Sequence, residues 1–310
     1  MIDLKYLQNN FEEASAKLHK KGVETTTLEN LKSLFASLKT ANATLESMKA
    51  EQNSMSKLFG QYKREGKDVG ELKAKVDANK DAMVPVQEKA REAEEALLSV
   101  ALAMPNFPDN SVPEGADEED NVELRKVLEP KEFTFKPKEH WELSEINGWI
   151  DFERGVKLAK SRFSVLRGEA SRLERALINF FLDTNAQKGF IEHSVPFMNN
   201  SAMLQGTGQL PKFEDDLFKI DGEDLYLIPT AEVPLTNLYN DEILTTKELP
   251  LLMTGYTPCF RKEAGSAGRD TRGIIRQHQF NKVEMVAIAH PDKSEEIFEM
   301  MVENASDILT

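Results

Sequence analysis

Apolar residues recur at alternating spacings of three and four along two segments of the N-terminal region. This heptad spacing is typical of coiled-coil helices, whose apolar seam faces a partner helix. A short glycine-containing stretch, 66–70, separates the segments, so we expect an antiparallel hairpin. Each segment has roughly thirty to forty residues, which predicts an arm about 50 Å long. The seam positions are Leu31, Leu34, Leu38, Ala41, Leu45, Met48, Met55, Phe59 and Tyr62 in the first segment and Leu72, Val76, Asn79, Met83, Val86, Ala90, Ala93, Leu97 and Val100 in the second.

A shorter helical pattern precedes the hairpin, and a loop-like segment follows it. Asp3 is a suitable N-cap residue, and Gly22 follows two lysines as at many helix ends, which predicts a helix over 3–21. The segment 105–121 is rich in proline, glycine and acidic residues, as linkers are. We therefore predict a helical domain over 1–104 that ends at this linker.

Beyond the linker, over 122–310, helical and strand-like patterns are separated by turns. Apolar spacing predicts a helix over 162–181, and short apolar runs predict strands over 190–195, 224–228 and 280–288. The pattern shows no repeated alternation of strands and helices. We therefore predict an α+β domain with a mainly antiparallel sheet flanked by helices.

The composition restricts the class of protein. The chain has 310 residues, 40% of them hydrophobic and 30% charged, and this length suits about two domains. No run approaches the ~20 apolar residues that a membrane span needs, and the N-terminus lacks the apolar core of a secretory signal. A single cysteine, Cys259, excludes an internal disulfide framework and a cysteine-rich zinc site. We therefore expect a cytoplasmic protein with no membrane partner.

The charge is distributed unevenly along the chain. The formal net charge of −14 argues against a nucleic-acid partner, because phosphate binding favours basic proteins. Acidic and basic residues balance over 1–100, however, so the net negative charge lies in 101–310. Between Lys57 and Lys80, at the expected tip of the hairpin, basic residues are in modest excess, which by itself fits a solvated helical tip better than a binding site. The basic residues of most interest there are Lys63, Arg64, Lys73 and Lys75.

The stretch 260–284 has two strand-like ends and a long loop of glycines and arginines between them. An ordinary hairpin needs only about two to five turn residues, and long irregular loops in compact domains are often functional. Arg261 and Arg276 suit phosphate, because guanidinium groups offer forked, permanently charged donors, although each alone is as consistent with a surface ion pair. Both glycine-rich phosphate-binding signatures are absent, so a nucleotide here would be held by side chains on a sheet.

Several further strings occur in order along the chain: HWEL at 140–143, LERAL at 173–177, GTGQLPKF at 206–213 and TAE at 230–232. Together with 260–284, they resemble the class II aminoacyl-tRNA synthetases in their bacterial seryl form. The stretch 260–284 is similar to the second signature motif of that class, and 173–196 is similar to the first, which builds a dimer interface. The hairpin resembles the family's tRNA-binding arm, so the resemblance covers 1–310.

The resemblance implies roles at a nucleotide site. Arg261 would be the catalytic residue, holding the α-phosphate of ATP and neutralising the charge that develops there. Glu263 would meet the adenine amino group and Phe280 would stack on the adenine ring, although Phe280 taken alone suits the core. Arg276 would be a second phosphate contact, and Lys262 belongs to the same expected ATP site.

The resemblance also implies contacts with serine and tRNA. Thr230 and Glu232 would bind the amino end of serine, and Glu284 would face the bound amino acid. The expected serine contacts are Thr230, Ala231, Glu232 and Glu284. The expected tRNA contacts are Lys63, Arg64, Lys73 and Lys75 on the arm, with Arg269 and Arg272 in the loop at the acceptor end.

The implied activity is that of a homodimeric serine–tRNA ligase. Serine and ATP would give seryl-adenylate, and serine would then pass to the 3′-end of tRNA(Ser), and of tRNA(Sec) in organisms that have it. Mg²⁺ would accompany ATP, with no metal-ligand set expected in this chain. Because the substrate carboxylate is the nucleophile, the chemistry needs positioning and charge stabilisation and no catalytic serine, cysteine or histidine. His278 and Cys259 are accordingly expected to be structural.

The family continues beyond the position of Thr310 into a third motif, so the resemblance implies that the chain is a fragment. Tested by itself, it is expected to form little or no seryl-adenylate. Two alternatives stay open. One is an amino acid–carrier-protein ligase, which would lack the hairpin arm; the other is a non-catalytic fragment that keeps the tRNA and dimer contacts. Transfer of an amino acid to a carrier protein, with none to tRNA, would favour the first alternative.

Overall fold

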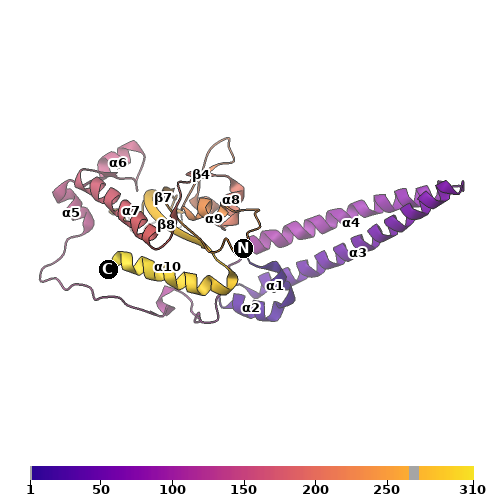
Figure 1. Cartoon of the computed structure of the whole chain (residues 1–310), viewed down its shortest axis with the longest axis horizontal. Coiled ribbons are helices and arrows are strands. Elements are labelled where there is room, and N and C mark those ends of the chain that lie inside the picture. The colour runs from indigo at the N-terminus through magenta and orange to yellow at the C-terminus, as the bar shows by residue number, and fades with distance from the viewer. Residues whose placement is uncertain (1, 265–271) are drawn as a thin grey trace. The chain divides into compact units, whose positions relative to one another are not determined.

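The computed structural model describes residues 2–264 and 272–310 (Figure 1). The chain divides into two compact units, Met1–Val122 and Glu123–Thr310. Within the described residues, no helix is both long and apolar enough to cross a membrane. The boundaries that the sequence predicts between the helical domain, the linker and the α+β domain stay a prediction.

Two long helices dominate the first unit. They are α3 (Thr25–Arg64) and α4 (Gly70–Ala103), which run side by side as a hairpin and confirm the predicted coiled coil (Figure 1). A polar pair, Asn79 and Gln52, interrupts the apolar seam. The Asn79 amide donates to Gln52 Oε1 and to the carbonyl of Met48, each at 3.0 Å. A polar pair in such a seam favours one register of the two helices over its neighbours.

Two short helices, α1 (Leu4–Asn9) and α2 (Phe11–His19), precede the hairpin. The prediction of one continuous helix here is therefore wrong. The chain leaves the helical conformation at Asn10, whose φ is −125° and whose amide donates to the Tyr6 carbonyl at 3.2 Å. Asparagine side chains compete in this way for helix backbone groups. The predicted N-cap residue, Asp3, does accept two backbone N–H groups of α1.

The core of the first unit lies where α1 and α2 pack on the open end of the hairpin. Its buried members include Ile2, Leu7, Leu18, Leu28, Leu31, Phe35, Leu97, Ala101 and Met104. Toward the tip, only two helices share the seam, so its apolar side chains are half-buried. A 3-10 helix, η1 (Glu118–Asp120), lies in the segment after α4.

A three-stranded sheet organises the second unit. Its order is β3 (Ile191–Glu192), β7 (Leu251–Phe260) and β8 (Gln279–Ile288). The long strands β7 and β8 pair antiparallel along their whole length, whereas β3 is parallel to β7. A smaller antiparallel sheet has the order β4 (Met198–Asn199), β6 (Tyr226–Leu227) and β5 (Phe218–Lys219). The predicted α+β class with mainly antiparallel pairing is confirmed.

Helices pack on both faces of the main sheet (Figure 1). They are α7 (Glu169–Gln187), α9 (Glu232–Asn237) and α10 (Ser294–Leu309). Side chains alternate between the two faces of a strand, so neighbours on β7 point to different helices. Thr254 is hydrogen-bonded to Asn185 of α7, whereas a side chain added at Gly255 would meet Leu235 of α9. The face toward α9 carries the candidate site.

The predicted helix over 162–181 is wrong at its start. The helix α7 begins after Gly168, whose φ of 53° is not helical, and Val165–Leu166 form strand β2 instead. Strand β2 pairs with β1 (Ile150–Asp151). Short apolar runs fit helix and strand equally well, so spacing alone could not separate the two. The remaining helices are α5 (His140–Asn147), α6 (Phe152–Leu158), α8 (Ser201–Gly206), η2 (Glu214–Asp216) and η4 (Pro291–Lys293).

Candidate active site

Strand β8 presents three functional side chains on the face toward α9. Phe280, Lys282 and Glu284 are two residues apart, and a strand has a period of two, so they share one face. Their partners on β7 are Cys259, Thr257 and Gly255, which are small. Small side chains on β7 leave room beside the long side chains of β8.

Two of these small residues are required by close packing. A Cβ atom at Gly255 would lie 2.9 Å from the carbonyl oxygen of His193 and 3.6 Å from Leu235. Cys259 is fully buried, and burial raises the pKa of its thiol, so the thiol stays neutral. Cys259 thus behaves as a small core residue, in agreement with its expected structural role.

A pocket of about 410 Å³ opens beside this face, a volume typical of small-molecule sites. The chain between β6 and α9 supplies one wall, with Thr230 and Glu232, and the end of β7 supplies another. The expected site residues that line the pocket are Thr230, Glu232, Arg261, Glu263 and Arg276. The remaining lining residues are Gln209, Phe213, Asp216, Leu217 and Pro229.

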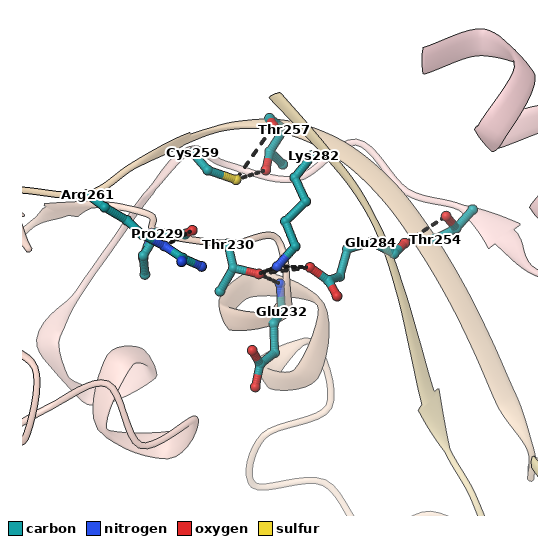
Figure 2. Close-up of polar contacts among 9 residues, drawn as sticks. All are labelled: Pro229, Thr230, Glu232, Thr254, Thr257, Cys259, Arg261, Lys282 and Glu284. Atoms are coloured by element: carbon teal, nitrogen blue, oxygen red, sulfur yellow. Dashed lines mark hydrogen bonds and ion pairs between the residues drawn. The ribbon is translucent and has the colours of Figure 1, made fainter. Parts of the chain in front are cut away.

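Thr230 is the centre of a polar cluster that links the pocket wall to β8 (Figure 2). Its hydroxyl donates to Glu284 Oε2 at 2.9 Å and accepts from Lys282 Nζ at 2.9 Å. Lys282 Nζ also forms an ion pair with Glu284 Oε2 at 2.5 Å. The backbone N–H of Glu232 donates to the same hydroxyl at 3.2 Å. The structure therefore brings the expected serine contacts Thr230, Glu232 and Glu284 together.

Glu232 differs from Glu284 in its electrostatic surroundings. In Figure 2 its carboxylate points away from the cluster around Thr230. Burial raises the pKa of Glu232 above its ordinary value, and the neighbouring Glu284 raises it further, whereas Lys282 and Arg261 oppose the shift. A cationic ligand group beside Glu232 would lower that pKa and stabilise the charged carboxylate.

Arg261 stands at the end of β7 and reaches past Pro229 toward Thr230 (Figure 2). Its Nε donates to the Pro229 carbonyl at 3.4 Å, and its guanidinium lies 5.3 Å from the centre of the Phe280 ring. Its backbone is held by His278, whose carbonyl accepts the Arg261 N–H at 2.9 Å and whose Nδ1 contacts the Arg261 carbonyl at 2.9 Å. His278 is buried and acts as a structural residue, as expected.

Arg276 and Glu263 line the pocket on the side away from the polar cluster around Thr230. They form an ion pair at 3.2 Å, so each orients the other. Glu263 has a φ of 53°, an uncommon conformation for a residue other than glycine, and such conformations concentrate at functional sites. Two charged residues of the expected ATP site are thus adjacent and mutually oriented.

Other expected residues lie outside this pocket lining. Ala231 is fully buried in a core cluster with Val195 and Met253, so its side chain is not offered to a ligand. Lys262 is exposed, with its Nζ 5.8 Å from the centre of the Phe218 ring. Neither residue lies in a strand: Ala231 is the N-cap of α9, and Lys262 follows the end of β7.

The expected tRNA contacts are separate from the pocket. Arg272 is exposed at a bend before β8, and Arg269 lies outside the described residues. The four arm residues Lys63, Arg64, Lys73 and Lys75 are exposed on the last turns of α3 and the first turns of α4. They therefore lie near the turn of the hairpin, where the sequence places the basic excess.

The sequence analysis missed two residues. Lys282 was overlooked, although its position midway between Phe280 and Glu284 on a predicted strand places it on their face. No sequence pattern indicated a role for Asp216. In the structure its carbonyl accepts the Lys262 N–H at 2.8 Å, and its Oδ1 accepts the Ala264 N–H at 2.7 Å. Asp216 thereby anchors the chain that follows Arg261.

Metal ions in proteins need sets of ligand side chains. Over 2–264 and 272–310, no group of three or more histidine, cysteine, aspartate or glutamate side chains could hold a metal ion. Glu263, a carboxylate on the expected nucleotide side, is already paired with Arg276. These residues do not fit a resident divalent cation.

Comparison with known proteins gives the family. A family model described as seryl-tRNA synthetase N-terminal domain matches residues 1–108, and one described as tRNA synthetase class II core domain (G, H, P, S and T) matches residues 212–310. The chain is 81% identical to the serine–tRNA ligase of Sulfurovum sp. and 62% identical to that of Sulfurimonas denitrificans. In each case the match covers 100% of this chain and 75% of the relative.

A solved structure agrees with these relatives. The crystal structure of seryl-tRNA synthetase from Pyrococcus horikoshii complexed with ATP superimposes with a TM-score of 0.88 at 34% identity. That match covers 100% of this chain and 74% of the solved chain. The hairpin, the sheet with its pocket and the sequence relatives lead to one conclusion: the chain belongs to the seryl-tRNA synthetase family.

Proposed function

We propose that the full-length protein activates serine with ATP and transfers the seryl group to the 3′-end of tRNA(Ser). The observation that carries the proposal is the pocket that joins Arg261 to Thr230 and Glu232, with Glu284 bonded to Thr230. The relatives named serine–tRNA ligase support the same reaction and favour it over transfer to a carrier protein.

The serine side of the pocket suits an amino acid with a hydroxyl group. The Glu232 carboxylate would bind the ammonium group, since burial and then the neighbouring Glu284 raise its pKa, and a cation beside it would stabilise the charged form. Glu284 would accept the substrate hydroxyl. An analogue without that hydroxyl would give the second oxygen of this half-buried carboxylate no donor, which disfavours its binding.

In the first step, a carboxylate oxygen of serine would attack the α-phosphorus of ATP. A new P–O bond forms as the bond to the β-phosphate oxygen breaks, and pyrophosphate leaves. Arg261 would stabilise the negative charge on the α-phosphate oxygens, because its guanidinium is permanently charged and anchored to Pro229. In the second step, a ribose hydroxyl of tRNA would attack the seryl carbonyl and release AMP.

The nucleotide would occupy the side of the pocket lined by Glu263 and Arg276. Phe280 offers a ring for the adenine beside Arg261, and Arg276 offers a phosphate contact. Lys262 belongs to this site as a proposal only, since its side chain is directed to Phe218. We assign no step to Mg²⁺, which would enter with ATP as the counter-ion of its phosphates.

The arm would bind the tRNA body through the basic residues near its tip. The hairpin carries these charges together, on the last turns of α3 and the first turns of α4. The backbone of tRNA is a dense array of phosphates, so exposed lysines and arginines are suitable partners. Arg272 would add a contact at the acceptor end.

We propose a homodimer as the assembled state, because the N-terminal half of α7 exposes large apolar side chains. Leu173, Leu177 and Phe180 are 60%, 43% and 51% exposed and lie on one side of the helix at spacings of four and three. A cavity of about 590 Å³ beside them is lined by Trp149 and Leu173. Exposed apolar surface of this kind marks interfaces.

The cytoplasm, which holds serine, ATP and tRNA together, is the proposed location.

The decisive experiment measures serine-dependent exchange of pyrophosphate into ATP and the charging of tRNA(Ser) in the full-length protein. We expect Glu232→Gln to reduce both activities, with Glu223→Gln, an exposed acid on the same unit, as the matched control. Transfer of an amino acid to a carrier protein, with none to tRNA, would refute the proposal. Direct calorimetric titration of serine and of ATP separates binding from chemistry.

A further inference from the structure

The hydrogen-bonding capacity of the Thr230 hydroxyl is fully used within the protein. A hydroxyl has one hydrogen to donate and two lone pairs that accept. Here the hydrogen goes to Glu284 Oε2, and the lone pairs receive Lys282 Nζ and the N–H of Glu232. Thr230 is only 3% exposed, so a substrate ammonium group would have to displace one of these bonds to reach the hydroxyl.

The hydrogen-bonding capacity of Lys282 Nζ is not used up in this way, and Nζ contacts both Thr230 and Glu284. Its Nζ lies 2.5 Å from Glu284 Oε2 and 2.9 Å from Thr230 Oγ1. Lys282 and Glu284 are two residues apart on a paired strand, so their backbones are held in a fixed relation. Both side chains are about a quarter to a third exposed, so water screens the ion pair less than at the surface.

These contacts use one oxygen of Glu284 and leave the other available. Within the described residues, both side-chain contacts of Glu284, from Thr230 and from Lys282, are made by Oε2. Oε1 is therefore the atom that can accept a hydrogen from a ligand. A carboxylate clamped at one oxygen presents the other in one direction, which is what recognition of a single hydroxyl requires.

We propose that Lys282 is a positioning residue that, with Thr230, orients Glu284 toward the hydroxyl of the substrate amino acid. This inference rests on the proposed function and reassigns the Thr230 side chain from a direct serine contact to a part of the clamp. Lys282 also balances the charge of two neighbouring carboxylates, Glu232 and Glu284. The charged or titratable groups around it are Glu232 on α9, Arg261 and Cys259 at the end of β7, and Glu284 on β8.

The pH dependence of serine binding can distinguish this positioning role from a merely structural one. Lys282 is a cation that favours the ionised form of Glu232, so its removal should make that carboxylate take up a proton at higher pH. Serine would then bind more weakly and regain affinity as the pH rises and Glu232 ionises. ATP would be little affected, because its proposed contacts are Arg261, Glu263 and Phe280.

The test compares Lys282→Met with the wild-type full-length protein by calorimetric titration of serine and of ATP over a series of pH values. We expect serine affinity at pH 7 to fall by about tenfold or more, which corresponds to ~1.4 kcal/mol, and to recover at high pH. Affinity for ATP should change by less than about twofold on the same scale. Lys282→Arg, which keeps the charge with a different geometry, should keep the pH profile but bind serine less tightly.

The matched control is Lys247→Met, an exposed lysine of the same unit, which should bind both substrates as the wild type does. Equal losses of serine and ATP affinity, with no recovery at high pH, would show a structural effect and overturn the inference. Unchanged serine binding in Lys282→Met would overturn it as well, while leaving the proposed function intact. A wild-type protein that binds no serine would instead refute the proposed function and this inference together.

Discussion

The amide of Asn185 on α7 donates a 2.9 Å hydrogen bond to the hydroxyl of Thr254 on β7. The hydroxyl of Thr254 in turn donates to the backbone carbonyl of Glu284 at 2.7 Å. On the other side, Asn304 of α10 donates to Asn185 Oδ1 at 2.7 Å. Three buried side chains thus tie two helices to the strand that carries the proposed serine contact.

Asn185→Leu should destabilise the second unit by about 2 kcal/mol, because it removes the amide that donates to the buried Thr254 hydroxyl and the oxygen that accepts from the buried Asn304 amide. Urea unfolding followed by circular dichroism measures this change. Asn179→Ala, an exposed position on the same helix, is the control and should cost much less. Equal stability of the two variants would mean that the buried chain contributes nothing.

Serine binding should weaken as the pH falls, with a midpoint above the ordinary pKa of glutamate. Burial and the nearby Glu284 raise the pKa of Glu232, so it takes up a proton sooner than a solvated carboxyl group. The protonated form cannot pair with an ammonium group. Glu232→Gln should lower serine affinity at pH 7 by about tenfold or more and remove this pH dependence, as calorimetry can measure. An unchanged pH profile would exclude Glu232 as the titrating group.

The arm should contribute electrostatic affinity for tRNA without affecting adenylate formation. We expect the combined change of Lys63, Arg64, Lys73 and Lys75 to Ala to weaken tRNA binding. The slope of log affinity against log salt should fall in magnitude by about 3. Filter binding over a salt series measures the slope, and pyrophosphate exchange measures adenylate formation.

The control for the arm is a variant of equal charge change away from the tip. Suitable exposed lysines in the same unit are Lys5, Lys21, Lys39 and Lys49. This control should lower tRNA affinity less than the tip variant does. An equal effect of both variants would indicate general attraction, with no contact at the tip.

Gly273 should tolerate no side chain, for two separate reasons. Its φ is +75°, and an added Cβ would overlap the imidazole ring of His140. That ring accepts the Ile274 N–H through Nε2 at 2.9 Å, so the overlap would break this bond. Gly273→Ala should therefore lower the melting temperature clearly more than Gly222→Ala, whose φ of +79° is similar but whose Cβ would meet open space.

The difference between these two glycine variants should be about 2 kcal/mol in the free energy of unfolding. Gly222→Ala carries only the backbone strain of a positive φ, which is about 1 kcal/mol. Equal effects of the two variants would show that His140 moves aside without cost.

The exposed apolar side of α7 should hold two copies of the chain together. Leu177→Glu should shift the protein from dimer to monomer, because a charge would be buried in an apolar contact. Light scattering after size-exclusion chromatography measures the mass. Val84→Glu, at an exposed apolar position on α4, is the control and should stay dimeric. A wild-type monomer at micromolar concentration would refute the proposed assembly.

The sequence alone determined those features that a local period or an ordered string can carry. The heptad spacing predicted the hairpin of α3 and α4, and the strand-like run over 280–288 predicted β8. The ordered strings identified Arg261, Thr230 and Glu284 as candidate site residues before any geometry was known. These features depend on neighbours along the chain, for which period and order are sufficient.

Tertiary structure decided what depends on residues distant in sequence. Thr230 and Glu284 are 54 residues apart, yet they share a hydrogen bond, and Lys282 completes their cluster. The break at Asn10 and the late start of α7 depend instead on local detail, a side-chain bond to Tyr6 and the conformation of Gly168, which an apolar period does not reveal. An apolar period indicates which face of an element is buried, but not which element covers it or which polar atoms then meet. That outcome is set by packing, because buried polar groups must find partners wherever the fold brings them.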